Sequence, residues 1–221
     1  YEHGIALDHG AFRAAHVALA AYGFMGLLAA GLSGFLLPML AVAPPPGPRV
    51  SSTALTGAMV AIALACFGFV SAGAILGLAA ATAHVASLER SLRARLRSPL
   101  GPAFVLIRVS WACLLGSLVL AALGFPGGTL LFGVLLVPGW LLTFLLGVLQ
   151  RILPFLGSVH ASTESRGTPL ISALTPVRLL AVHRVLHLGA LGLLLGAVLS
   201  GEPVLARIGA AEADAFLRDR P

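Results

Sequence analysis

HVALAAYGFMGLLAAGLSGFLLPML, residues 16–40, contains no acidic residue, lysine or arginine and begins with a histidine. A helix that crosses the hydrocarbon core of a bilayer needs about 20 apolar residues, so this stretch is long enough to span it. The whole chain is 58% hydrophobic and 10% charged, with a mean hydropathy of +1.00, whereas soluble domains carry about 25% charged residues. The composition therefore predicts an all-α polytopic transmembrane helix bundle in contact with the lipid bilayer.

Breaks rich in proline, glycine or arginine divide the apolar sequence into five predicted spans, at residues 14–42, 54–83, 104–123, 130–156 and 180–199. The breaks read APPPGPR at 43–49, RSLRARLRSPLGP at 90–102, GFPGG at 124–128 and STESRGTP at 162–169. Residues 1–201 then form one transmembrane helical domain. Residues 202–221 form a short extracytoplasmic tail, either an amphipathic helix on the membrane surface or a frayed end.

The basic residues predict the orientation of the chain in the membrane. The net charge is +6 and every basic residue is an arginine in or near a loop, which favours membrane orientation over nucleic-acid binding. With five spans, the side of the N-terminus receives ten of the 14 arginines, so the N-terminus is predicted to be cytoplasmic. The expected location is the bacterial cytoplasmic (inner) membrane. Arg49, Arg207, Arg218 and Arg220 fall on the other side.

Five histidines occur near the ends of predicted spans, and five crossings place all of them at the N-terminal side of the membrane. Two interpretations are open: polar residues collect at helix ends, or the imidazoles form a ligand set. The spacing of four residues between the last two histidines puts them on one helix face. The five are His16, His84, His160, His183 and His187.

Imidazole ligands without paired cysteines or a carboxylate cluster favour haem iron or copper over structural zinc. The metal-ligand candidates are His16, His84, His160 and His187, since His183 and His187 on one helix cannot take opposite faces of one haem. Cys66 and Cys113 are expected to be small buried apolar residues.

Two arginines are candidates for binding the propionates of a haem. Arg151 and Arg184 lie near His160 and His183, and guanidinium matches carboxylate geometry. The alternative is that both arginines reach the lipid head groups. Gln150, next to Arg151, is a polar residue in the otherwise apolar span 130–156, and Pro154 is expected to bend the end of this helix.

Three segments carry a resemblance to a known group. GFMGLLAAGLSGFLLPML (23–40) follows His16, GWLLTFLLGVLQRILPFLGSVH (139–160) ends in a PF-x-x-x-x-H pattern, and VHRVLH (182–187) comes next. In this order they resemble uncharacterised bacterial multi-pass membrane proteins related to haem-copper oxidase subunit I and to NnrS-type haem-copper proteins. Where the first motif of that group has a second histidine, this chain has Ala18.

The resemblance implies haem b, with copper as a further candidate cofactor, and nitric oxide or respiratory chemistry. The first functional hypothesis is therefore a haem-binding membrane protein for electron transfer or small-gas (NO or O2) chemistry, with a cytochrome or quinol as redox partner. The second is a cofactor-free structural or assembly subunit of a respiratory membrane complex. The third is a copper-handling membrane protein.

Other membrane subunits or a second copy of the chain are the expected protein partners. The sequence shows no nucleophile or general-acid constellation, and the centres of the spans hold no Asp or Glu. Whether the protein is an enzyme is left open.

Overall fold

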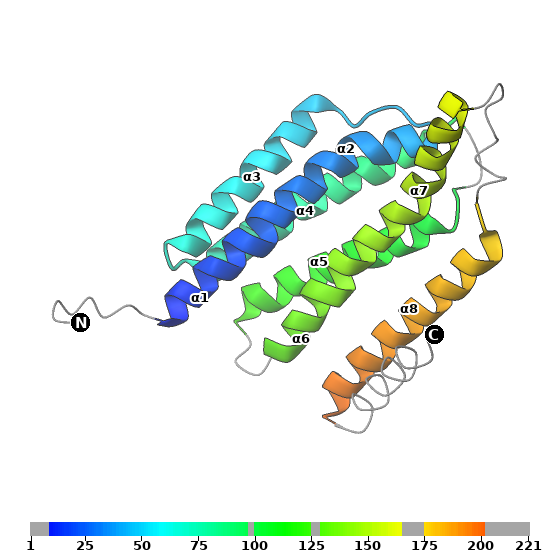
Figure 1. Ribbon diagram of the computed structural model, residues 1–221. Coiled ribbons are helices and arrows are strands. Elements are labelled where there is room, and N and C mark those ends of the chain that lie inside the picture. The colour runs from blue at the N-terminus through cyan, green and yellow to red at the C-terminus, as the bar shows by residue number, and fades with distance from the viewer. Residues whose placement is uncertain (1–8, 97–99, 125–128, 165–174, 202–221) are drawn as a thin grey trace. The chain divides into compact units, whose positions relative to one another are not determined.

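The computed structural model describes residues 9–96, 100–124, 129–164 and 175–201, and the regular elements within them are helices (Figure 1). Six helices in this part of the chain are long and apolar enough to cross a membrane: Phe12–Ala41, Pro48–Cys66, Val70–Arg93, Ala103–Leu123, Leu130–Ala161 and Val177–Ser200. The all-helical class is therefore confirmed for the described residues, and these helices have the length and apolar composition that membrane spans require. The tail at 202–221 lies outside the described residues.

The chain divides into two compact units, and the boundary falls inside the helix α5 (Ala103–Leu123). Unit 1 consists of Tyr1–Leu100 and Leu114–Pro126, and unit 2 of Gly101–Cys113 and Gly127–Pro221.

Unit 1 begins with α1 (His9–Val17), a π-helical segment η1 (Ala18–Gly26) and α2 (Leu27–Ala41), which follow one another without a break. The helix ends at Val42, whose φ of 52° lies in the left-handed region. Its length agrees with the first predicted span.

The second predicted span, 54–83, is not one helix: it covers parts of two helices, α3 (Pro48–Cys66) and α4 (Val70–Arg93). Gly68 adopts a φ of 89° after α3. The Phe69 N–H donates to the Leu64 carbonyl at 2.9 Å and the Gly68 N–H to the Ala65 carbonyl at 3.2 Å. These two bonds form a Schellman motif, which ends a helix at a glycine free of the Cβ penalty.

The helices α3 and α4 form a hairpin and lie side by side (Figure 1), and they approach closely where α4 has a glycine. A Cβ added to Gly73 would lie 2.6 Å from the Ala61 carbonyl oxygen and 3.1 Å from the Ala65 nitrogen. Small residues at such crossings let helix backbones approach in lipid.

Unit 2 contains the first half of α5, then α6 (Thr129–Val134), a π-helical segment η2 (Leu135–Leu142), α7 (Thr143–Glu164) and α8 (Val177–Ser200). The π-helical turn contains Pro138, which cannot donate a backbone hydrogen bond. A Cβ on Gly139 would meet the Cys113 sulfur at 2.9 Å, and one on Gly147 would meet Ile107 at 2.9 Å. Glycines therefore set the close contact of this unit with α5.

The two cysteines differ in burial. Cys113 is buried, as predicted, whereas Cys66 at the end of α3 is partly exposed.

Candidate functional site

The first two histidines lie in unit 1 but are far apart. The His84 ring lies 3.0 Å from the Ser33 hydroxyl, measured at Nε2. Ser33 follows His16 by 17 positions on one continuous helix, roughly 25 Å at about 1.5 Å per residue. The two imidazoles therefore cannot share one metal ion within this unit.

The end of α4 is bonded to the end of α2, which corrects the predicted side of His84. The Ser91 hydroxyl donates to the Pro44 carbonyl, and the Leu96 N–H donates to the Val42 carbonyl at 3.0 Å. His84 therefore lies toward the end of unit 1 opposite His16, because the hairpin at Gly68 reverses the direction of α4.

The bonding of the Ser33 hydroxyl shows which atom donates in its hydrogen bond with His84. The Ser33 Oγ is 2.9 Å from the Ala30 carbonyl, to which it donates its only proton. Ser33 must then accept from His84, so Nε2 carries the proton on the neutral ring. This contact joins α2 and α4 across 51 residues of sequence.

In unit 2, α8 presents two histidines to α7. The Thr143 hydroxyl donates to the Pro138 carbonyl at 2.7 Å and accepts from His187 Nε2, also at 2.7 Å. The Gln150 side-chain Nε2 donates to His183 Nδ1 at 3.1 Å. The two rings are stacked, with centroids 6.3 Å apart and planes 6° from parallel. This confirms the shared face expected from their spacing.

His160 does not join this pair. It is exposed and lies ten positions beyond Gln150 on α7, roughly 15 Å along the helix. Gln150 is hydrogen-bonded to His183, and Thr143 to His187, so α7 and α8 run antiparallel. His160 therefore lies beyond the start of α8. Within the described residues, no three His, Cys, Asp or Glu side chains gather as a metal site.

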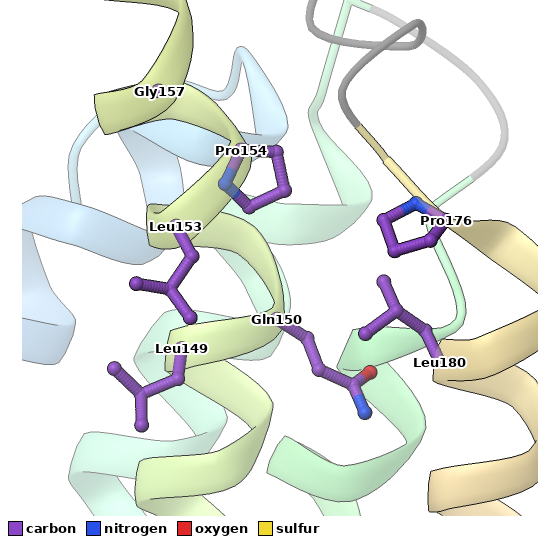
Figure 2. A pocket seen from close by; sticks show the side chains of 7 residues that line it. All are labelled: Leu149, Gln150, Leu153, Pro154, Gly157, Pro176 and Leu180. Atoms are coloured by element: carbon purple, nitrogen blue, oxygen red, sulfur yellow. The ribbon is translucent and has the colours of Figure 1, made fainter. Parts of the chain in front are cut away.

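A pocket of about 310 Å³ opens between α7 and the start of α8 (Figure 2). Gln150 supplies the polar group in its lining, and the other lining residues are Leu149, Leu153, Pro154, Gly157, Pro176 and Leu180. Gln150 is 7% exposed. Its buried Oε1 finds no donor among the described residues.

The two candidate arginines have different surroundings. The Arg151 guanidinium lies 5.8 Å from the centre of the Phe104 ring, a cation–π contact with α5. The buried Nη1 of Arg184 finds no acceptor in the described part of the chain. Arg184, the residue after His183 in α8, thus keeps one buried donor that an anionic group could accept.

Haem binding can be tested against this arrangement. Neither unit brings two imidazoles to opposite sides of one position among its described residues, so a two-histidine haem site within a unit does not fit. A haem held by a single histidine is compatible with His183, which contacts Gln150 through Nδ1 and leaves its other ring nitrogen for a ligand. His183 then replaces His187 as the ligand candidate, since Thr143 occupies the Nε2 of His187.

Two hydroxyl partners, Ser33 and Thr143, were not among the residues singled out in the sequence. Each lies in an apolar helix, where serine and threonine commonly bond their own backbone. The spacing of histidines gave no sign of which hydroxyl each ring would meet, because those partners are 51 and 44 residues away.

No protein-family model, curated protein or solved structure matches the chain.

Proposed function

We propose that the protein is an integral membrane haem-binding protein, in which His183 holds the iron and Arg184 pairs with a propionate. The observation that carries the proposal is the buried Nη1 of Arg184, which has no acceptor among the described residues and belongs to the residue that follows His183, whose imidazole is oriented by Gln150. A buried donor without a partner is costly, so a carboxylate ligand would complete it.

Iron binding at His183 requires the Gln150 amide to turn. In the present arrangement Nδ1 accepts from the amide, which leaves the proton of the neutral ring on Nε2. Turning the amide by 180° lets Oε1 accept from Nδ1–H and leaves the Nε2 lone pair for a metal. Metal-bound histidines usually donate their other ring N–H in this manner.

A haem held by one imidazole supports electron transfer and leaves a position for a small gas such as NO or O2. The protein's own contribution is to orient the ring of His183, to neutralise a propionate and to exclude water with the leucines of α7 and α8. This proposal agrees with the haem implied by the sequence resemblance, but it uses one histidine where a larger set was expected.

The orientation in the membrane changes with the hairpin at Gly68. We propose that all six apolar helices cross the membrane, which would put both termini on one side with Arg13, Arg207, Arg218 and Arg220. The other ten arginines, which include Arg90, Arg93 and Arg95 at the end of α4, fall on the opposite side. The positive-inside rule then places the N-terminus outside the cytoplasm, opposite to the orientation derived from five spans. Reporter fusions at each terminus test this orientation.

A cofactor-free structural or assembly subunit is the second candidate. It is favoured by the hydroxyl contacts of His84 and His187, which join helices without any ligand. Under this function, replacing His183 leaves the composition of the purified protein unchanged.

The deciding experiment is an absorption spectrum of the detergent-purified protein, oxidised and dithionite-reduced, with metal analysis of the same sample. The haem proposal predicts a haem spectrum that shifts with carbon monoxide, because His183 would be the one protein ligand and the iron could bind a small gas. His183→Ala should lose the haem, whereas His160→Ala, the matched control, should retain it. Well-folded protein from its native host without haem or metal would favour the structural subunit instead.

A further inference from the structure

One end of unit 1 gathers basic side chains. Among the described residues of this unit, four of the five arginines occur where α3 begins and α4 ends (Figure 1). We call these four the arginine cluster: Arg49, Arg90, Arg93 and Arg95. Arg13, the fifth, lies near the start of the first helix, at the opposite end of the unit. Glu89 is the single acidic residue in the described part of unit 1, so the cluster keeps a net positive charge.

The packing of the hairpin brings Arg49 level with the end of α4. A Cβ on Gly57 of α3 would lie 3.4 Å from the Ala80 Cβ of α4. Arg49 is eight residues before Gly57 and Arg90 is ten residues after Ala80, and the two helices run antiparallel. At about 1.5 Å per residue, the two arginines lie within roughly 3 Å of the same level. Arg93 follows Arg90 by three positions, a spacing that makes them neighbours on the helix surface.

Hydrogen bonds fix the backbone that carries the cluster. Bonds from the Ser91 hydroxyl and the Leu96 N–H join the end of α4 to the segment after α2. The Arg95 Nη1 donates to the Leu92 carbonyl at 3.0 Å, which holds this guanidinium at the end of α4. Cationic groups on a fixed backbone lose less freedom when they bind a ligand.

The exposed charges select an anion with several acceptor oxygens. Arg49, Arg90 and Arg93 are exposed, and Glu89 can neutralise at most one of the four guanidinium groups. Guanidinium binds phosphate oxygens through paired N–H groups. A phosphate group therefore complements the cluster.

Apolar side chains beside the cluster indicate that this phosphate belongs to a lipid. Leu96, next to Arg95, is 88% exposed. The face of α4 that ends in Arg90 also exposes Ile75, Ala79 and Ala83, at intervals of four and seven residues. This face is apolar along its length and basic at its end, as a phospholipid is apolar along its acyl chains and charged at its head group.

We propose that the arginine cluster binds the phosphate of an anionic phospholipid, whose acyl chains run along the exposed face of α4. The phosphate oxygens accept from Arg90 and Arg93, and Arg49 and Arg95 add positive charge at the same level. Basic residues beside a membrane helix attract anionic lipids. The inference concerns unit 1 alone and does not rest on the haem proposal for unit 2.

The test is native mass spectrometry of the detergent-purified full-length protein, titrated with phosphatidylglycerol or with phosphatidylcholine of the same acyl chains. We expect the first phosphatidylglycerol to bind at least about fivefold more tightly, because its head group is a net anion whereas choline cancels the phosphate charge. Equal binding of the two lipids would overturn the proposal.

Two variants with the same loss of charge locate the site. Arg93→Gln and Arg13→Gln each remove one exposed arginine, the first in the cluster and the second at the opposite end of unit 1. Arg93→Gln should reduce the preference for phosphatidylglycerol at least about threefold, whereas Arg13→Gln should leave it unchanged. Both side chains are exposed, so neither variant should prevent folding. Equal effects would contradict the proposal, since a general attraction to positive charge would then be sufficient.

Inorganic phosphate distinguishes a lipid head group from a free anion of the same chemistry. Phosphatidylglycerol that stays bound in a large excess of inorganic phosphate supports the phospholipid, because the acyl chains then contribute to binding. Its release by phosphate would assign the cluster to a free anion and overturn the phospholipid. The haem content of the same samples is a separate measurement, so failure of the haem proposal would leave this inference standing.

Discussion

In both units a histidine N–H donates to a hydroxyl group on another helix, but the surroundings of the two contacts differ. In unit 1, His84 donates to Ser33, which donates to its own backbone, and neither residue has a buried side-chain atom among those found without a partner. In unit 2, His187 donates to Thr143 in the same way, yet Gln150, which contacts His183, has a buried Oε1 without a donor among the described residues, and Arg184 in the same helix as His183 has a buried Nη1 without an acceptor. The first contact is complete, and the second has capacity for a ligand.

Another contact of this kind, in unit 1, indicates that a hydrogen bond to a hydroxyl on another helix usually serves to join the two helices. The Tyr22 hydroxyl lies 2.9 Å from the Ser117 hydroxyl, which donates to the Leu114 carbonyl at 2.8 Å. In each case the hydroxyl donates its hydrogen bond to a carbonyl of its own helix and accepts a hydrogen bond from another helix. A histidine in an apolar helix is therefore not evidence for a ligand site until its surroundings include an unsatisfied group.

The largest effect is expected at the helix hairpin that supports the unit 1 contact. Gly73→Leu should lower the free energy of unfolding by about 3 kcal/mol, because the new side chain meets the α3 backbone. Gly31→Leu is the matched control in open space. SDS titration of both variants measures the difference, and equal stability would mean that the hairpin does not pack as described.

Two alanine variants separate the two histidine contacts directly. His84→Ala should lower stability by about 1–2 kcal/mol without changing haem content, since it removes an interhelical bond and its packing. His183→Ala should reduce haem content at least about tenfold with a smaller effect on stability. Haem per protein and SDS titration on the same samples are the measurements; loss of haem in His84→Ala would reverse the comparison.

Removing one hydroxyl tests whether His187 is structural like His84. Thr143→Val keeps the shape of the side chain and leaves His187 Nε2–H without its acceptor. We expect a loss of about 0.6–1.7 kcal/mol in unfolding free energy, the range of interhelical hydrogen bonds in membranes. Ser33→Ala should fall in the same range. A much larger effect of Thr143→Val on haem content than on stability would place His187 in the ligand site.

The smallest effect is expected at the end of α2, where the chain turns toward α3. Val42 is a β-branched residue with a φ of 52°, so Val42→Gly should raise the unfolding free energy by about 0.5–1 kcal/mol. Ala41→Gly, in the helix just before it, should lower the unfolding free energy instead. Identical signs for the two variants would contradict the left-handed end of this helix.

Four of the five predicted spans each correspond to one helix, because their proline- and glycine-rich boundaries are local signals. The division of 54–83 was missed because FGF at 67–69 is apolar and only its glycine marks the turn. Because of this missed turn, His84 was expected at the same end of the helices as His16, whereas it lies toward the opposite end of unit 1. Equally, Gly31 and Gly34 of the first span meet no atom within 4 Å of an added Cβ, whereas Gly73 and Gly147 do. Which glycine packs depends on the neighbouring helix, and no spacing within one helix reveals it.

The sequence by itself was sufficient to predict a membrane environment and a helical secondary structure for this protein. Apolar runs of about 20 residues satisfy their backbone groups in lipid only as helices, so length and composition were sufficient. Only the tertiary structure decided the partners of the histidines. Hydrogen bonds over 2.7–3.1 Å between residues 33 to 51 positions apart depend on which helix faces meet. The same structure separates His84, which donates to a hydroxyl that is itself bonded to its own helix, from His183, whose partner Gln150 has a buried Oε1 without a donor among the described residues.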